Sequence, residues 1–182
     1  KLGMSIRFNE NDAREMGRTA TGVRGIKLRD DDFVVAMDSV SSGNQLLVVT
    51  EKGYGKRTEL DQYPLQNRGG FGVKTLQLTD KTGGIVGARL VQEDHELMVS
   101  TKQGTLIRTS VDGISVIGRA TQGVRVIRLA DDDEVTAIAR IEVEDVVEDD
   151  ELLDGDGESA EAGEFESSDE EISSDETDDS DE

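Results

Sequence analysis

The hydrophobic pattern of residues 1–141 is that of short strands separated by polar turns. Two apolar runs, residues 45–50 and 96–101, each end at a three-residue turn whose last position is glycine. Such a turn is typical of a hairpin closed by a residue in the left-handed region. We therefore predict return strands at residues 54–58 and 105–109. No segment shows the periodicity of a long helix.

Two further strands are predicted after each hairpin. A polar stretch of about a dozen residues follows the return strand and contains the one proline, Pro64. Strands are then expected at residues 73–79 and 124–129, and, after turns rich in Gly or Asp, at residues 85–91 and 135–141. Four strands in succession are typical of one blade of a propeller-like fold.

Three sequence markers recur in the same order about every fifty residues, which is a blade-sized period. The first has glycine four residues before arginine, at residues 3–7, 53–57 and 104–108. The second runs from an arginine to a Gly-Val-basic triplet, at residues 18–24, 68–74 and 119–125. The third is the apolar-x-Leu triplet at residues 26–28, 76–78 and 127–129. We predict three repeats, approximately 1–44, 45–94 and 95–144. The first copy begins inside a turn, so we expect a piece of a longer protein with more repeats upstream.

The charge divides the chain into two parts. The formal net charge is -21, yet no Lys or Arg follows Arg140, and 22 of the 41 acidic residues lie within residues 141–182. Residues 145–182 are therefore predicted to be a disordered acidic tail, because they bury too little apolar surface to offset their ordering entropy. The absence of cysteine excludes disulfides and thiolate metal sites. No apolar run is long enough to cross a membrane, and we find no signal peptide.

Residues 10–26 strongly resemble a blade segment of the C-terminal domain of DNA gyrase A. Residues 53–58 and 118–124 resemble it as well, and the resemblance extends over residues 1–141. It implies an all-β fold, a β-pinwheel of six blades that wraps DNA around its rim. The chain would then hold the last three four-stranded blades and the acidic tail. Residues 66–72 keep five of the seven residues of the family's signature heptapeptide, Gln-Arg-Arg-Gly-Gly-Lys-Gly.

The resemblance also implies what the whole enzyme does. It would be a bacterial, ATP-hydrolysing type II DNA topoisomerase that introduces negative supercoils, in the cytoplasm and associated with the nucleoid. Its partners would be double-stranded DNA and gyrase B, with two copies of each gyrase protein in the complex. ATP and Mg²⁺ would act elsewhere in that enzyme, so we expect no cofactor, metal ion or catalytic residue here. The DNA-cleaving tyrosine is expected upstream, so Tyr54 and Tyr63 are not assigned that role.

Repeated basic residues are the candidates for DNA contacts. Equivalent residues of a wheel share one circumferential track, and neutralising phosphates gives affinity that does not depend on sequence. The candidates are Arg18, Arg24, Arg68, Lys74, Arg119, Arg125, Lys56 and Arg57. The alternative is a structural role in which these side chains bridge blades or donate to loop carbonyls. For the set Arg7, Arg57 and Arg108, packing along a blade is the favoured alternative.

Two other functions stay open. One is a protein-binding β-propeller scaffold with an acidic tail, and the other is the C-terminal domain of the gyrase A counterpart in topoisomerase IV. The tail itself is either a solubilising extension or a tethered polyanion that competes with DNA for the basic rim. Residues 68–72 are not a nucleotide-binding loop, because no helix is predicted after them. His95 has no second histidine or cysteine with which to bind a metal.

Overall fold

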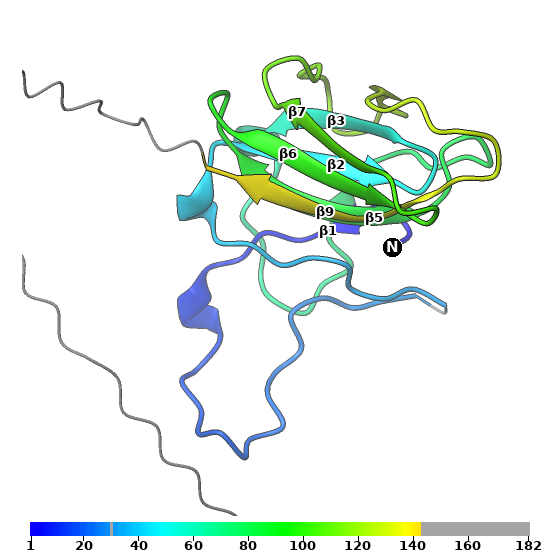
Figure 1. The fold of residues 1–182 in the computed structure, drawn as a ribbon. Coiled ribbons are helices and arrows are strands. Elements are labelled where there is room, and N and C mark those ends of the chain that lie inside the picture. The colour runs from blue at the N-terminus through cyan, green and yellow to red at the C-terminus, as the bar shows by residue number, and fades with distance from the viewer. Residues whose placement is uncertain (30, 143–182) are drawn as a thin grey trace, which may run out of the picture. The chain divides into compact units, whose positions relative to one another are not determined.

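The computed structural model describes residues 1–29 and 31–142, and this part of the chain is built from antiparallel strands and short turns (Figure 1). The predicted tail, residues 145–182, lies outside the described residues. The strands are β1 (Met4–Ser5), β2 (Gln45–Thr50), β3 (Tyr54–Glu59), β4 (Val73–Lys74), β5 (Ile85–Val91), β6 (Glu96–Thr101), β7 (Leu106–Ser110), β8 (Val124–Arg125) and β9 (Val135–Ile141). Three single-turn 3-10 helices are η1 (Glu10–Asp12), η2 (Val40–Ser42) and η3 (Leu60–Gln62). The all-β prediction is confirmed.

The hairpins form where the apolar runs predicted them. β2 pairs with β3, and β6 pairs with β7, across turns that end at Gly53 and Gly104. These glycines have φ values of 73° and 87°, in the left-handed region that other residues rarely adopt. In the second and third repeats the last strand returns to the hairpin of its own repeat, so that β5 lies beside β2 and β9 lies beside β6. Each of these pairings has a register shift just before the hairpin turn.

The fourth strand of the middle sheet comes from the following repeat. The strand order is β5-β2-β3-β8, and β8 belongs to the third repeat. At the preceding junction β4 of the second repeat pairs with β1 of the first repeat in the same way. The expectation that one repeat supplies all four strands of a blade therefore needs correction. The exchanged strands are also shorter than predicted, with two residues each instead of six or seven.

The backbone hydrogen bonds explain why the exchanged strands end so early. After β8 the amides of Val126 and Ile127 both point to the carbonyl of Gly53 in the hairpin turn, at 2.9 and 3.1 Å. At the first junction Thr75 donates in the same way to the carbonyl of Gly3, at 2.8 Å. In a regular ladder successive amides of a strand do not donate to the same carbonyl. Where two of them do, the chain bends around the hairpin turn and the strand pairing stops.

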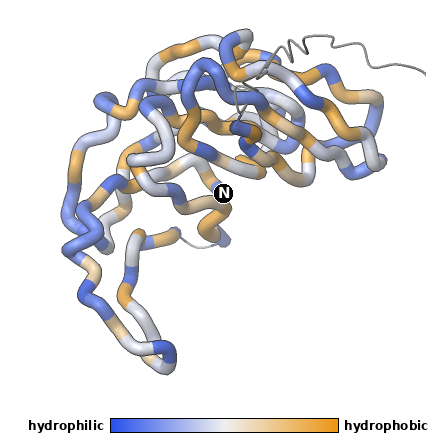
Figure 2. The backbone as a smooth tube through the Cα atoms, turned by 60° about the vertical axis from the view of Figure 1, so that its left-hand side comes forward, coloured by the Kyte–Doolittle hydropathy of each residue, from blue (hydrophilic) through white to orange (hydrophobic). Residues whose placement is uncertain are grey.

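The main hydrophobic core lies between the second and third repeats. Leu47, Val49 and Val91 of the middle sheet pack against residues of the third repeat, including Leu97 and Val99. Figure 2 shows apolar and polar positions alternating along the strand-rich part of the backbone, whereas the long loop that follows β1 is mainly polar. A thin sheet with few aromatic side chains buries little surface alone, so each sheet depends on its neighbour for a covered face.

Arg57 is buried at the second junction, with 4% of its surface exposed. Its Nε donates to the carbonyl of Ile114 at 2.7 Å, and its Nη2 donates to the carbonyl of Asp112 at 2.8 Å. Its Nη1 donates to Oε1 of Gln45 at 2.9 Å. Arg7, one repeat earlier, donates in the same manner to the carbonyls of η3 and its cap. These arginines fasten the hairpin of one repeat to the loop of the next.

Lys56 is fully buried beside Arg57. Its Nζ donates to the carbonyls of Gly118 and Arg119, at 2.6 and 2.5 Å, and to Oγ1 of Thr121 at 3.1 Å. Burial, together with the nearby positive charge of Arg119, lowers the pKa of Lys56 from 10.5 to about 8. No carboxylate is among its hydrogen-bond partners in the described residues, so three oxygen dipoles stabilise the ammonium.

Replacing Arg57 by Lys should destabilise the fold far more than the same change at Arg108. Lysine cannot reproduce a planar fork that donates in three directions, so buried carbonyls lose their partners. We expect Arg57→Lys to lower the free energy of unfolding by about 2–3 kcal/mol and Arg108→Lys by less than about 0.5 kcal/mol. Arg108 is the matched control because it occupies the equivalent repeat position on an exposed strand. Urea unfolding measures both, and equal losses would contradict the assigned role.

The charge of Lys56 should make stability depend on pH above neutrality. Between about pH 8 and 10.5 the unfolded chain still binds the proton that the folded chain has lost, so stability rises with pH in that window. Relative to a Lys56→Met variant, the protein should gain about 1.5 kcal/mol between pH 8 and 9.5, at about 1.4 kcal/mol per pKa unit. Unfolding curves of both proteins across this range test it, and parallel pH profiles would show that Lys56 does not titrate there.

Candidate nucleic-acid interface

The eight candidate residues divide into an interior pair and an exposed or half-exposed set. Lys56 and Arg57 lie in the interior, with their polar groups hydrogen-bonded to the third repeat. A phosphate cannot reach them without opening that junction, so their assignment to DNA contacts is corrected to a structural role. The remaining candidates are Arg18, Arg24, Arg68, Lys74, Arg119 and Arg125.

Arg68 and Arg119 are half-buried and join consecutive repeats. Nη1 of Arg68 donates to the carbonyl of Arg24 at 2.6 Å, and Nη1 of Arg119 donates to the carbonyl of Lys74 at 2.9 Å. The two bonds are equivalent, because each arginine reaches the exchanged-strand position of the repeat before it. This is the bridging role that was the alternative to DNA contact. A guanidinium has five donors, so these bonds leave others for a phosphate.

Arg24, Lys74 and Arg125 share one repeat position, and all three are exposed. Lys74 and Arg125 are the last residues of β4 and β8, the strands that cross between repeats. The carbonyl of Lys74 accepts a hydrogen bond from Arg119 of the third repeat, and Arg125 pairs with Tyr54 of the second repeat. Both residues are exposed to solvent. This position therefore presents an exposed cation in each of the three repeats.

Arg125 and Lys81 flank the ring of Tyr54. Cζ of Arg125 and Nζ of Lys81 each lie 5.6 Å from the ring centroid. Nη2 of Arg125 also donates to the Tyr54 hydroxyl at 3.2 Å. This hydrogen bond lowers the pKa of Tyr54, and Lys81 acts in the same direction. The three residues, here the Tyr54 cluster, come from three segments and gather two positive charges around one aromatic face.

Phe71 stands at a second cluster of the same kind. Its ring is 45% exposed and lies 4.8 Å from Nζ of Lys27 and 5.8 Å from Cζ of Arg29. Phe71 belongs to residues 66–72, the degenerate copy of the heptapeptide, and it stands where the heptapeptide has its lysine. The cations come from the first repeat instead. The Phe71 cluster and the Tyr54 cluster each combine charges with a stacking surface.

Repeat comparison missed both clusters for an identifiable reason. Lys27, Arg29 and Lys81 do not keep a basic residue at the equivalent position of every repeat, so they fall outside a search for recurring cations. Tyr63, by contrast, is buried, and its hydroxyl lies 2.5 Å from Oγ1 of Thr75. Burial raises the pKa of Tyr63. Tyr54, which is half-buried, is therefore better placed than Tyr63 to meet a ligand.

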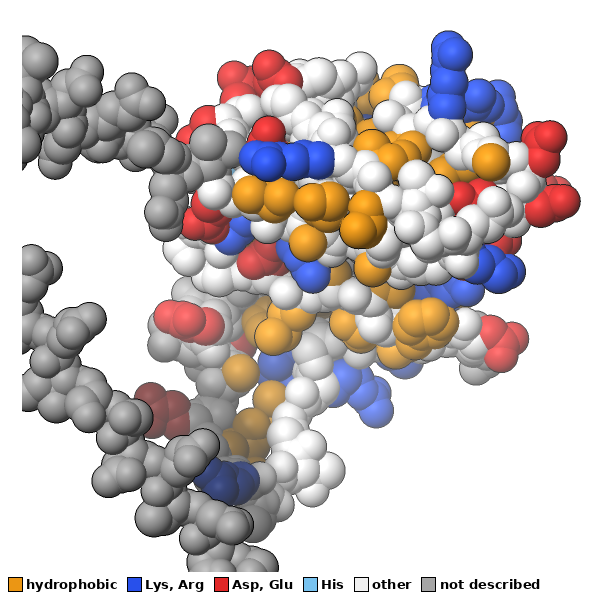
Figure 3. Space-filling model, viewed as in Figure 1, with side chains coloured by type: hydrophobic (Ala, Val, Ile, Leu, Met, Phe, Trp, Pro, Cys, Tyr) orange, Lys and Arg blue, Asp and Glu red, His pale blue; other side chains and the backbone are white. Residues whose placement is uncertain are grey.

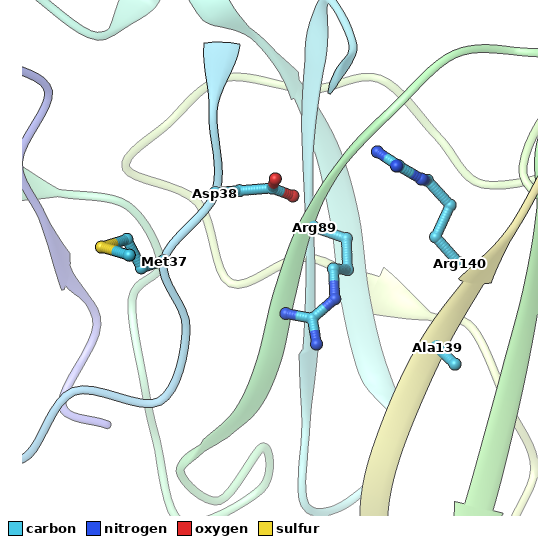
Figure 4. A pocket seen from close by; sticks show the side chains of 5 residues that line it. All are labelled: Met37, Asp38, Arg89, Ala139 and Arg140. Carbon is cyan, nitrogen blue, oxygen red and sulfur yellow. The ribbon is translucent and has the colours of Figure 1, made fainter. Parts of the chain in front are cut away.

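Basic side chains are spread over the visible face rather than gathered in a single patch (Figure 3). A hollow of about 270 Å³ is lined by Met37, Asp38, Arg89, Ala139 and Arg140. The two guanidinium groups point in different directions (Figure 4). Arg140 donates to the carbonyls of Ser42 and Leu90, so its charge is already engaged within the protein.

Two other sequence features have structural explanations. His95 is buried, and its Nδ1 accepts a hydrogen bond from the amide of Gln92 at 3.0 Å, which closes the turn before β6. Among the described residues, no group of three or more His, Cys, Asp or Glu side chains is placed to hold a metal ion. No helix in residues 1–29 and 31–142 is long and apolar enough to span a membrane.

The chain matches known proteins along all three repeats. The family model of the DNA gyrase C-terminal domain, a β-propeller, matches residues 1–41, 44–92 and 95–142. The DNA gyrase A protein of Salmonella typhimurium is 47% identical over 180 residues, which cover 99% of the chain and 20% of that protein. The gyrase A protein of Ureaplasma parvum is 50% identical over 137 residues, 75% of the chain and 16% of that protein. The chain thus spans about a fifth or less of these relatives' lengths.

Solved structures agree with this match. The structure of a DNA gyrase A C-terminal domain superposes with a TM-score of 0.72 at 33% identity and covers 77% of the chain and 48% of that domain. The C-terminal domain of DNA topoisomerase IV gives the same TM-score at 23% identity, over 78% of the chain and 44% of that structure, and shows the shared fold alone. The repeats, the exchanged strands and these matches together show that the chain belongs to the DNA gyrase C-terminal domain family.

Proposed function

We propose that this chain is a DNA-binding and DNA-wrapping part of a DNA gyrase A protein. The observation that carries the proposal is the exposed cation at one repeat position of every repeat, Arg24, Lys74 and Arg125. Lys74 and Arg125 stand on strands that cross between repeats, and Arg24 occupies the equivalent position of the first repeat, so the spacing of the charges follows the spacing of the repeats. A track of this kind suits a bent duplex, because its contacts recur as the backbone curves around the protein.

The two aromatic clusters add to that track. Each holds a pair of cations against a ring at a junction between repeats, so the charges are positioned before DNA arrives. Side chains that are already ordered lose less conformational entropy on binding than free lysines would. Contacts to phosphates give affinity without base preference, which is what wrapping of arbitrary DNA requires.

In this proposal the chain is an accessory to the chemistry. The whole enzyme would be an ATP-dependent type II topoisomerase that introduces negative supercoils in the bacterial cytoplasm, at the nucleoid. It would contain gyrase B and use ATP and Mg²⁺ in parts that this chain does not include. The chain would hold a bent duplex on its rim and present it to the DNA-cleaving part of the enzyme. The two DNA segments would then always cross with the same handedness.

The rim proposal predicts a specific change in salt dependence. A Lys81→Ala/Arg125→Ala variant should bind random duplex DNA about tenfold more weakly at low salt, and its salt slope should be shallower by about two. Sequence preference should not change, because phosphate contacts carry no base information. Titrations over a range of salt concentrations measure both quantities.

A matched double variant provides the control. Lys102→Ala/Arg108→Ala removes the same charges from the β6–β7 hairpin, where Glu134 and Glu96 already engage both side chains. It should change affinity much less. Wild-type affinity and slope in a stable Lys81→Ala/Arg125→Ala protein would show that the Tyr54 cluster does not contact DNA.

The acidic tail is expected to weaken DNA binding. Residues 145–182 carry 20 acidic groups. Deleting this segment should raise affinity at low salt, and the gain should shrink as salt screens the charges. Binding measured with the full chain and the truncated chain tests this. Equal affinities at low salt would show that the tail acts only as a solubilising extension.

A further inference from the structure

The loop of residues 118–121 in the third repeat is fastened to side chains of the second repeat. Oε1 of Gln62 accepts a hydrogen bond from the amide of Arg119 at 3.1 Å. Nζ of Lys56 donates to the carbonyls of the first two loop residues, at 2.6 and 2.5 Å, and to Oγ1 of Thr121 at 3.1 Å. One buried ammonium therefore supplies three of the hydrogen bonds that fix this loop.

The loop in turn places the guanidinium of Arg119. Its Nη1 donates to the carbonyl of Lys74, the exposed cation of the second repeat, at 2.9 Å. Its Cζ lies 5.9 Å from the ring centroid of Tyr63. The bond to Lys74 uses one of the five donors of a guanidinium, and Arg119 is half-buried, so a phosphate can still reach it. Lys56 itself is buried, yet it sets the position of a cation that DNA can contact.

The first junction holds the equivalent loop without a charge. Ile6 occupies the position of Lys56, and Gly70 occupies the position of Thr121. A Cβ on Gly70 would lie 3.7 Å from Cδ1 of Ile6, so an apolar contact stands where the second junction has an ammonium and a hydroxyl. Arg68, the counterpart of Arg119, still donates to the repeat before it. The two junctions therefore present the same arginine on differently fastened loops.

The hold of Lys56 on the loop depends on its proton. An ammonium has three N–H donors for three oxygens, whereas a neutral amine has two and turns a lone pair toward the third. Arg119 is the charged group that faces Lys56, and burial together with this charge lowers the pKa of Lys56 to about 8. Val48, directly opposite Lys56 on β2, does not titrate, and burial raises the pKa of Tyr63, which stays neutral there. Loss of the proton therefore weakens the fastening of the loop.

We propose that Lys56 is a positioning residue for DNA binding, because its ammonium holds the loop of residues 118–121 so that Arg119 meets a phosphate. A phosphate bound by Arg119 also offsets the repulsion between that guanidinium and the ammonium, so DNA binding and protonation of Lys56 favour each other. The proton that folding tends to release is thus retained when DNA binds. The inference rests on the proposed function and names a residue through which that function is regulated.

A double-mutant cycle tests whether Lys56 acts through Arg119. At pH 7 and low salt, Lys56→Met and Arg119→Ala should each weaken binding of the full chain to random duplex DNA by about threefold or more. The double variant should bind within about twofold of Arg119→Ala alone, because the positioned group is already gone. In an Arg68→Ala background, the matched control, Lys56→Met should keep its full effect.

The outcomes of this cycle separate the two proposals. Multiplying effects in both backgrounds, or unchanged affinity in a folded Lys56→Met protein, would overturn the positioning role. Unchanged affinity in Arg119→Ala would do the same. A wild-type chain that does not bind DNA would refute the proposed function, and this inference with it.

The wild-type chain offers a second test that does not depend on the folding of Lys56→Met. The Cε resonance of Lys56, assigned through its own backbone, should titrate with a midpoint of about 8 in the free protein. Bound duplex should raise the midpoint by about half a unit or more, equivalent by linkage to about a threefold loss of affinity on deprotonation. The rise should shrink in an Arg119→Ala protein. Equal midpoints with and without DNA, or a rise that Arg119→Ala leaves unchanged, would contradict the coupling.

Discussion

The exchange of a two-residue strand between neighbouring repeats is the interaction on which the rest of the structure depends. β8 covers the edge of β3, and the loop before it carries the carbonyls that surround Lys56. The same loop region brings acceptors to Arg57. If β8 and the loop before it left the edge of β3, that strand edge would be open, Lys56 would lose its three acceptors, and Arg57 would lose two of its three. The junction is therefore cooperative: its ladder, its polar network and its apolar core form together or not at all.

Basic residues of the second and third repeats that meet at one junction differ in their surroundings. Lys56 and Arg57 lie on a central strand and face oxygen atoms of the next repeat, so their charges serve to hold blades together. Arg125 stands at the end of the exchanged strand that covers them, and its guanidinium faces solvent beside Tyr54. Burial and exposure at one junction thus separate the charges that hold the repeats together from the charge proposed to contact DNA. The proposed DNA track is carried by the same strand that closes the blade.

The strands themselves could be predicted because they depend on local signals. Apolar runs, glycine-terminated turns and the repeat period place β2, β3, β6 and β9 within a residue or two of their observed ends. The exchange could not be predicted, because a strand of two residues has almost no pattern and its partner is chosen by tertiary contacts. The role of Lys56 was missed for a related reason: its acceptors are backbone carbonyls some sixty residues away, which leave no trace in composition. The Tyr54 cluster was missed because Lys81 has no counterpart that would mark it as recurring.

Lys56 also distinguishes one junction from the other. The equivalent residues of the first and third repeats are Ile6 and Ile107, so the polar interior occurs once among these repeats. The repeat that follows the second one must place oxygen atoms around Lys56, since an unpaired buried ammonium is costly. The repeats share one pattern of strands, but they differ in the polarity of the side chain that they carry at this position. A single lysine thus gives the junction between the second and third repeats a polar interior that the junction before it lacks.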